Sequence, residues 1–409
     1  MSLFLPCAGG VEPLLADEVR ALLPDATLEL ARGGVALPRG SLADAMTLNL
    51  ESRLAQRVLV RVAHGRYRDE ADIYALARAV DWPAWITPQQ TLRVDATANR
   101  SPLRSLNFAA LRVKDALCDR LREATGARPS VDTRRPDLAL ALHLEAEHAS
   151  LYVDSSGEPL FKRGWRDASA HGANVKGEAP LKETLAAAML AAAGWRGRSD
   201  DGALLDPCCG AGTIVIEAAQ IACGIAPGAQ RAFAFERLAP WRALLPEWRR
   251  LQRAARERVH ASAVPIFAGD VSFRMTDFAR RNAERAGVAH AIEFKAADAL
   301  QRPAPASRGT MVLNPPYGER IAPKGRGAAA PAVASRETAE GGQDAFFAQL
   351  AAHWKRHYAG WTAWVLSPDA KLPSRMRLKE GRRVPMWNGP IECRLFRFDL
   401  VAGSNRPAT

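Results

Sequence analysis

The chain has 409 residues, which predicts two or three domains, and its 48% hydrophobic and 24% charged content excludes a largely disordered protein. A formal net charge of +12 favours a polyanionic partner, because clustered Lys and Arg release condensed counterions from phosphates. Residues 185–195 form the longest apolar stretch, too short to span a bilayer, and no basic leader opens the chain. We therefore expect a cytoplasmic protein with no membrane partner.

Cysteine and histidine spacing gives no sign of a metal centre. The six cysteines form no Cys-x-x-Cys pair, and the adjacent Cys208 and Cys209 cannot easily share one metal ion or one unstrained disulfide. His353 and His357 are four residues apart, but the residues between them include no glutamate and two cations. We expect buried thiols, surface histidines and no metal.

The first 155 residues alternate between strand and helix patterns and contain no catalytic constellation. A first small α+β unit has an expected strand at 3–8, a helix at 12–23 and a strand at 27–37. Further on we expect strands at 58–62 and 91–97, helices at 72–79 and 106–124, and a hairpin from 138–144 and 150–153. Residues 100–135 hold nine basic and four acidic side chains. A solvated helix face explains that charge as well as a nucleic-acid contact does.

The second half of the chain alternates strands with longer helical patterns, which predicts a parallel doubly wound sheet. Expected strands cover 264–270, 291–298, 310–313 and 361–366, with helices opening at Ser272 and covering 346–358. A cationic hairpin is expected within 369–397, and the Ala- and Gly-rich residues 325–342 are expected to form a mobile loop. The segment 227–259 is an insertion that ends in an arginine-rich helix. Its Trp241 and Trp248 are expected to pack inside the protein.

A strand, a glycine-bearing bend and a helix are predicted at residues 204–217. Gly210 and Gly212 permit positive φ, so the bend can lie close to a ligand at the start of the following helix. No Gly-Lys-Ser/Thr phosphate motif follows, and the third glycine of a dinucleotide fingerprint is missing. Asp206 at the strand end attracts a cationic ligand. S-adenosylmethionine, which carries an ammonium and a sulfonium, fits these residues.

Two further carboxylates follow expected strands, at Asp270 and Asp298. Ligands of an open α/β sheet bind outside the carboxyl ends of the strands. There Asp270 can accept hydrogen bonds from two ribose hydroxyls, and Asp298 can accept one from an adenine amino group. An aspartate after a strand is also a common turn or cap residue, so the set of three carries more weight than any one member.

The sharpest motif is Asn314-Pro315-Pro316-Tyr317, after another apolar strand. The prolines remove backbone donors and stiffen the loop, so the Asn314 amide and a proline carbonyl can act as acceptors in the cleft. An exocyclic amine suits these acceptors, and Tyr317 can stack on the base that carries it. We expect all four residues to take part in catalysis without a nucleophilic cysteine or a strong base.

Several segments together resemble the THUMP-domain rRNA methyltransferases that modify guanine N2. The resemblance is carried by residues 107–109, 114–116, 128–129, 156–166, 179–184 and 388–395. It implies an α/β fold, with a Rossmann-like methyltransferase domain built on a doubly wound sheet and an N-terminal α+β ferredoxin-like and THUMP RNA-binding region. The implied boundaries are 1–56 ferredoxin-like, 57–156 THUMP, 157–178 hinge and 179–409 methyltransferase. The long 325–342 segment departs from the family, and a second methyltransferase half present in some members is missing.

The resemblance implies S-adenosylmethionine as cofactor and a guanosine N2 of large-subunit (23S) rRNA as methyl acceptor, in free RNA or in a ribosomal precursor. A tRNA guanine-N2 methyltransferase would share every motif. A DNA adenine-N6 or protein glutamine methyltransferase would share Asn-Pro-Pro-Tyr but not the THUMP-like region. A non-catalytic rRNA assembly factor would bind RNA without turnover.

Overall fold

The computed structural model describes residues 1–166, 181–315 and 343–401. Backbone proximity divides the chain into two compact units, each described by itself below. The N-terminal unit contains Met1–Cys7, Leu15–Phe161 and Pro227–Ala254, and the C-terminal unit contains Ala8–Leu14, Lys162–Ala226 and Ala255 onward. The expected methyltransferase segment 179–409 is thus interrupted by an insertion that packs with the N-terminal unit. The linear boundaries inferred from the sequence remain predictions.

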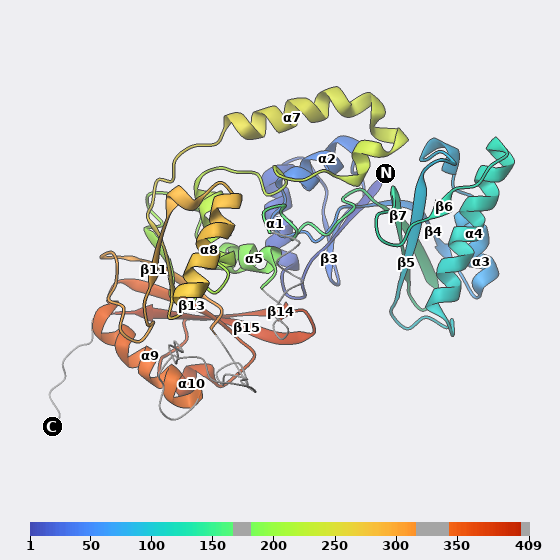
Figure 1. Ribbon diagram of the computed structural model, residues 1–409. Helices are drawn as coiled ribbons and strands as arrows, with labels where there is room; N and C mark the ends of the chain where they lie inside the picture. Colours follow the sequence, from blue (N-terminus) through green and yellow to red (C-terminus); the bar gives the residue numbers. More distant parts are fainter. Residues whose placement is uncertain (167–180, 316–342, 402–409) are drawn as a thin grey trace, which may run out of the picture. The chain divides into compact units, whose positions relative to one another are not determined.

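The N-terminal unit is built on one eight-stranded sheet with the order β2-β3-β1-β4-β8-β7-β5-β6 (Figure 1). Its strands are β1 (Ser2–Pro6), β2 (Glu29–Ala31), β3 (Gly34–Leu37), β4 (Leu59–Arg66), β5 (Thr91–Ala98), β6 (Ser130–Val131), β7 (Leu138–Leu144) and β8 (His148–Asp154). Its helices are α1 (Glu12–Leu22), which the boundary between the units crosses, α2 (Leu42–Glu51), α3 (Glu70–Arg78) and α4 (Leu106–Thr125). The ferredoxin-like and THUMP regions share this sheet, because β1 pairs with both β3 and β4.

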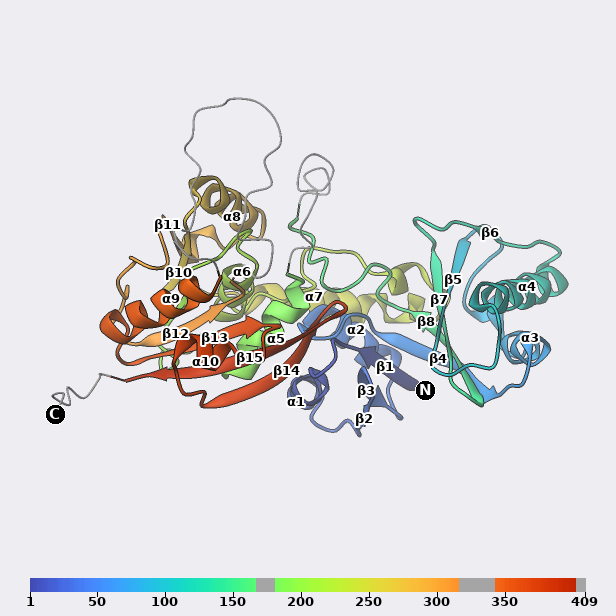
Figure 2. The same cartoon turned by 90° about the horizontal axis from the view of Figure 1, so that it is seen from below.

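Local sequence signals explain these elements well. Alternate residues of β1 are buried, as expected for a strand with one face on the core. The helix α4 begins where Ser105 accepts a hydrogen bond from the Phe108 amide and ends at Gly126 with φ 76°. In Figure 2, α3 and α4 lie together on one side of β4, β5 and β7. The single strand expected at 27–37 is wrong: a turn at Arg32-Gly33 splits it into the hairpin β2–β3.

The insertion continues the N-terminal unit through η2 (Ala234–Arg237), η3 (Ala239–Leu244) and most of α7 (Leu245–Glu257), whose last three residues belong to the C-terminal unit. Trp241 and Trp248 are almost fully buried, and both pack on Phe235. The prediction that these tryptophans pack inside the protein is therefore confirmed.

The C-terminal unit is a doubly wound α/β sheet with the order β11-β10-β9-β12-β13-β15-β14. Its strands are β9 (Ala203–Asp206), β10 (Ile266–Asp270), β11 (Ile292–Ala296), β12 (Gly309–Leu313), β13 (Trp361–Ser367), β14 (Arg382–Asn388) and β15 (Ile391–Leu400). Its helices are α5 (Glu183–Ala193), α6 (Thr213–Ala222), α8 (Phe273–Arg285), α9 (Gln343–His357) and α10 (Leu372–Met376). The pairings among β9 to β13 are parallel, and β15 runs antiparallel to β13 and β14.

The expected terminal hairpin is confirmed as β14–β15, which turns at Gly389 with φ 63°. One face of the sheet is covered by α9, whose Phe346, Leu350 and Trp354 are buried in a core with β12 and β13. The expected loop at 325–342 and part of the expected hinge lie outside the described residues. Among the helices that the structure describes, none is long and apolar enough to cross a membrane.

Candidate cofactor and substrate site

The strand register brings the predicted polar residues to one edge of the C-terminal sheet. Asp206 ends β9 and is level with Ala268 of β10, so Asp270 lies two residues beyond it. Asp270 is level with Ala296 of β11, and Asp298 follows two residues later. On the other side of β9, Asn314 directly follows β12, which pairs with β9 in parallel. The four side chains therefore come from adjacent strands at their carboxyl ends, where α/β sheets bind ligands.

The bend after β9 is held against the end of β10. The Cys209 amide donates a hydrogen bond to the Gly269 carbonyl at 2.7 Å, and the Gly210 amide donates one to Oδ2 of Asp270 at 3.0 Å. Gly210 and Gly212 have φ of 50° and 82°, which L side chains rarely adopt. A Cβ on Gly212 would stand 3.0 Å from the Cβ of Ala279, whereas one on Gly210 would meet no atom within 4 Å. Gly212 is thus needed for packing, and Gly210 borders open space.

Asp206 differs electrostatically from a surface carboxylate. It is 2% exposed, and its Oδ1 accepts a hydrogen bond from the Cys208 amide at 3.1 Å. Burial, reinforced by the nearby Asp270, raises the pKa of Asp206 to about 8. Burial also raises the pKa of Asp270 and of the Cys209 thiol. Asp206 therefore holds its proton at neutral pH and can gain negative charge when a cation enters.

Asp270 and Asp298 are oriented by short local contacts that leave acceptor capacity. Oδ1 of Asp270 accepts from the Ser272 amide at 2.9 Å, and Oδ1 of Asp298 accepts from the Leu300 amide at 2.8 Å. A carboxylate has about four lone-pair sites. Both residues thus act as turn caps and can also accept hydrogen bonds from a ligand.

Asn314 carries an unsatisfied acceptor. Its Oδ1 is buried and has no hydrogen-bond partner in the part of the chain that the structure describes. The neighbouring Pro315 is buried as well. A buried acceptor left unpaired costs about 1–3 kcal/mol, which a ligand donor would recover. Pro316 and Tyr317, the other two predicted catalytic residues, lie outside the described residues.

Two buried ion pairs support the helix that follows the glycine bend, and the sequence analysis missed both. Arg163 binds Glu217 of α6 through two hydrogen bonds, at 3.0 and 3.3 Å. Arg166 pairs with Glu183 of α5 and donates to the Thr213 hydroxyl at the start of α6, at 2.8 Å. Glu217 within the apolar run of α6 was the one available signal, because a lone buried carboxylate requires a partner.

The expectation of two surface histidines is wrong for His353 and right for His357. His353 is 4% exposed, and its Nε2 lies 2.6 Å from the carbonyl oxygen of Arg302. His357 is exposed. The described residues contain no group of three or more potential metal ligands. Five of the six cysteines are buried, and Cys208 is partly exposed.

The fold and the strand-end residues define an α/β protein that binds its ligand at the carboxyl edge of a parallel sheet. Three family models match the chain: an RlmL ferredoxin-like domain at residues 2–59, a THUMP domain at 67–154 and an RMKL-like methyltransferase domain at 171–330. The chain therefore belongs to the THUMP-containing methyltransferases with an RlmL-type N-terminal domain.

Curated relatives and solved structures agree with this assignment. The chain is 34% identical over 416 residues to the ribosomal RNA large subunit methyltransferase K/L of Psychromonas ingrahamii, covering 100% of the chain and 51% of the relative. It is 38% identical over 412 residues to the enzyme of that name from Syntrophotalea carbinolica, covering 97% of the chain and 53% of the relative. The chain thus spans about half the length of these relatives. The crystal structure of SMU.472 complexed with SAH aligns with a TM-score of 0.82 and 25% identity, covering 98% of this chain and 99% of that one.

Proposed function

We propose that this protein transfers a methyl group from S-adenosylmethionine to the N2 amine of a guanosine in large-subunit rRNA. The observation that carries the proposal is the buried Oδ1 of Asn314, which has no hydrogen-bond partner among the described residues and lies beside the strand that precedes the glycine bend. An exocyclic amine offers the donor that this acceptor lacks. An rRNA substrate also implies a cytoplasmic protein, acting on free RNA or on a ribosomal precursor.

The residues of the carboxyl edge fit the cofactor. Asp206 would accept the ammonium group, Asp270 the ribose hydroxyls and Asp298 the adenine amine, because each retains acceptor sites. Gly210 and Gly212 would let the bend lie against the ligand, since Gly210 borders open space. When bound, the cofactor supplies an electrophilic methyl group, and the chain's task is to place an amine in line with it.

On the substrate side, we propose that Asn314 and the Pro315 carbonyl accept the two hydrogens of the guanine amine. Those hydrogen bonds orient the nitrogen lone pair and disfavour its delocalisation into the base. Pro316 would stiffen the motif and Tyr317 would stack on the base. The guanosine must be unpaired or flipped to enter the site. The N-terminal unit, with its THUMP domain, would hold the surrounding RNA.

Methyl transfer from labelled S-adenosylmethionine to 23S rRNA, tRNA and DNA in separate reactions, followed by nucleoside digestion, tests the proposal. We expect N2-methylguanosine from 23S rRNA. N2-methylguanosine from tRNA alone would move the substrate to tRNA, and N6-methyladenosine from DNA would refute the guanine assignment. RNA binding without any methyl transfer would favour the assembly factor instead.

A further inference from the structure

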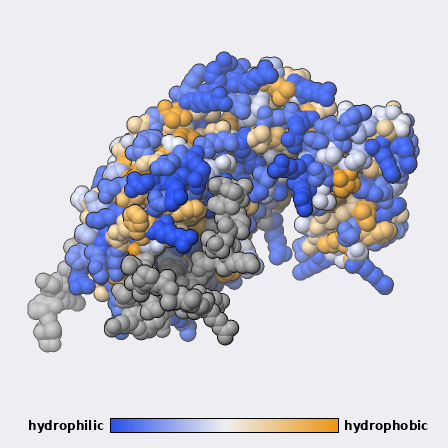
Figure 3. Space-filling view, in the orientation of Figure 1, coloured by the Kyte–Doolittle hydropathy of each residue, from blue (hydrophilic) through white to orange (hydrophobic). Residues whose placement is uncertain are grey.

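The exposed side of α7 is covered by arginines. Arg249, Arg250, Arg253 and Arg256, called the α7 arginine face below, are all exposed. Only one ion pair within the described residues involves this face, between Arg250 and Glu247 at 3.6 Å, and the Arg250 side chain in it is 71% exposed. The space-filling view shows hydrophilic surface over α7 (Figure 3). The helix thus presents concentrated positive charge, and among the described residues only Arg250 of this face forms an ion pair.

Aromatic packing fixes α7 to the rest of the N-terminal unit. Trp248, on the opposite side of the helix, is 2% exposed and packs edge-on against Phe233 and Phe235 at ring distances of 5.6 and 5.0 Å. Trp241 donates from Nε1 to the Leu42 carbonyl at 3.0 Å. Burial of several aromatic rings gives the insertion a core of its own on α2. The arginines are therefore displayed on a fixed helix.

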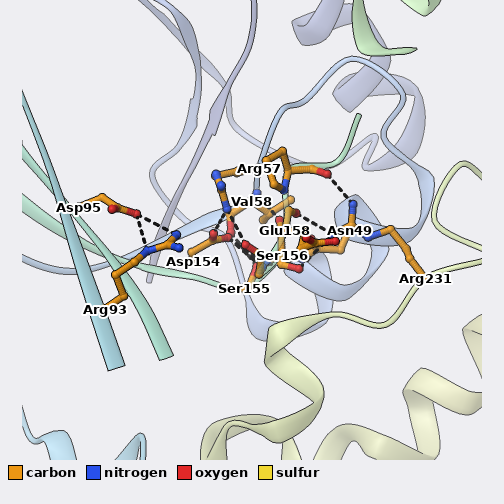
Figure 4. Close-up of polar contacts among 12 residues, drawn as sticks. Asn49, Arg57, Val58, Arg93, Asp95, Asp154, Ser155, Ser156, Glu158 and Arg231 are labelled. Atoms are coloured by element: carbon orange, nitrogen blue, oxygen red, sulfur yellow. Dashed lines mark hydrogen bonds and ion pairs between the residues drawn. The ribbon is translucent and has the colours of Figure 1, made fainter. Parts of the chain in front are cut away.

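Hydrogen bonds from one side chain to backbone carbonyls connect the start of the insertion to the segment after the THUMP sheet. Arg231 donates to the carbonyls of Glu158 and Pro159 at 2.6 and 2.8 Å. The segment that supplies these carbonyls follows a buried network in which Asn49 bonds Ser155 and Ser156 at 2.8 and 2.6 Å (Figure 4). The insertion and the THUMP region therefore belong to one compact unit.

The cations of α4 in the same unit provide a contrast. Lys114 pairs with Asp115 and Arg122 pairs with Asp119, while Arg112 lies over the ring of Tyr74. These contacts fit a solvated helix face, one of the two explanations that the sequence allowed for the charge of residues 100–135. On α7, by comparison, Arg249, Arg253 and Arg256 have no ion pair among the described residues. Three exposed arginines on one helix, without an ion pair among the described residues, favour the binding of an anion from outside the protein.

We propose that the α7 arginine face binds the sugar-phosphate backbone of the substrate RNA, as a second RNA contact beyond the THUMP domain. Arg249, Arg253 and Arg256 follow one another at helical spacing over an axial rise of about 10 Å, so their long side chains can reach successive phosphates. Such contacts carry no base specificity and position the RNA. The inference rests on the proposed function only in taking rRNA as the ligand.

The test compares the full-length protein with three double variants for binding to transcribed 23S rRNA at several salt concentrations. Arg249→Gln with Arg253→Gln removes two charges from α7 at little cost in helix propensity. Arg249→Lys with Arg253→Lys keeps the charges. Arg196→Gln with Arg198→Gln is the matched control, since these exposed arginines precede a turn that contains Asp200 and Asp201.

We expect the α7 Gln pair to weaken binding by up to roughly 25- to 60-fold near 0.1 M salt and to lower the logarithmic salt slope by about 1.4–1.8, as for two lost phosphate contacts. The Lys pair should keep the slope, and the control should bind like the unmodified protein. Equal losses in the α7 and control Gln pairs, or no loss in either, would overturn the inference. If the unmodified protein binds rRNA but transfers no methyl group, the proposed function fails, and the α7 comparison still decides this inference.

Discussion

Affinity for S-adenosylmethionine should rise steeply between about pH 6 and about pH 8, because Asp206 must lose a proton to pair with the cofactor's ammonium group. Burial raises the pKa of Asp206 to about 8 in the protein without ligand. Below that pH most molecules carry a neutral Asp206, and the binding-competent ionised form is a minor population. Apparent affinity then scales with the ionised fraction.

The size of the effect follows from that pKa. With a pKa of about 8, the ionised fraction is about 1% at pH 6, about 9% at pH 7 and about 50% at pH 8. The apparent dissociation constant should therefore fall roughly 50-fold from pH 6 to pH 8. Binding at pH 7 should also release about 0.9 proton per cofactor.

Calorimetry in two buffers of different ionisation enthalpy measures both quantities. Asp206→Asn should show nearly pH-independent affinity, close to that of the unmodified protein at pH 6, because a neutral amide resembles the protonated acid. A dissociation constant that changes less than about twofold over this range, with no proton release, would refute the proposed role of Asp206.

The same pKa makes a prediction for stability without ligand. Folded Asp206 keeps its proton up to about pH 8, whereas the unfolded chain loses it near the ordinary aspartate pKa of 3.8. The folded state thus binds more protons in this window, so the contribution of Asp206 to stability falls as pH rises to about 8 and is constant above it. The melting temperature of Asp206→Asn, minus that of the unmodified protein, should grow from about pH 5 to pH 8. A pH-independent difference would contradict the raised pKa.

Three further predictions concern single side chains. Asn314→Ala should lower methyl-transfer turnover on the order of 100-fold and leave cofactor affinity unchanged, so equal losses in both would assign it a structural role. Gly212→Ala should lower the free energy of unfolding more than Gly194→Ala does, since both have positive φ but only the former meets a close neighbour; denaturant titration decides. Glu217→Ala should cost about 3–5 kcal/mol in the same assay by leaving Arg163 buried without its carboxylate, and stability unchanged within about 1 kcal/mol would contradict this.

Local sequence patterns were sufficient for most of the fold. The helix expected at 106–124 from its apolar periodicity matches α4 to within one residue, and the structure shows Ser105 and Gly126 capping its two ends. Apolar runs before Asp206, Asp270 and Asn314 predicted strands of a parallel sheet with these polar residues at one edge, since parallel strands share that edge. The order of the strands came from the structure. Reasoning from apolar patterns failed at residues 27–37, where a turn at Gly33 interrupts what was expected to be one strand.

The sequence by itself thus determined the order of the elements, the doubly wound sheet and the set of candidate site residues. Only the tertiary structure decided which polar groups are buried and desolvated. Burial makes Asp206 a proton-holding acid, places His353 in the core and leaves the Asn314 acceptor unpaired among the described residues. It also groups the 227–254 insertion with the N-terminal unit. These properties depend on residues that are distant in the chain and pack around each group. That packing cannot be predicted from a local sequence pattern.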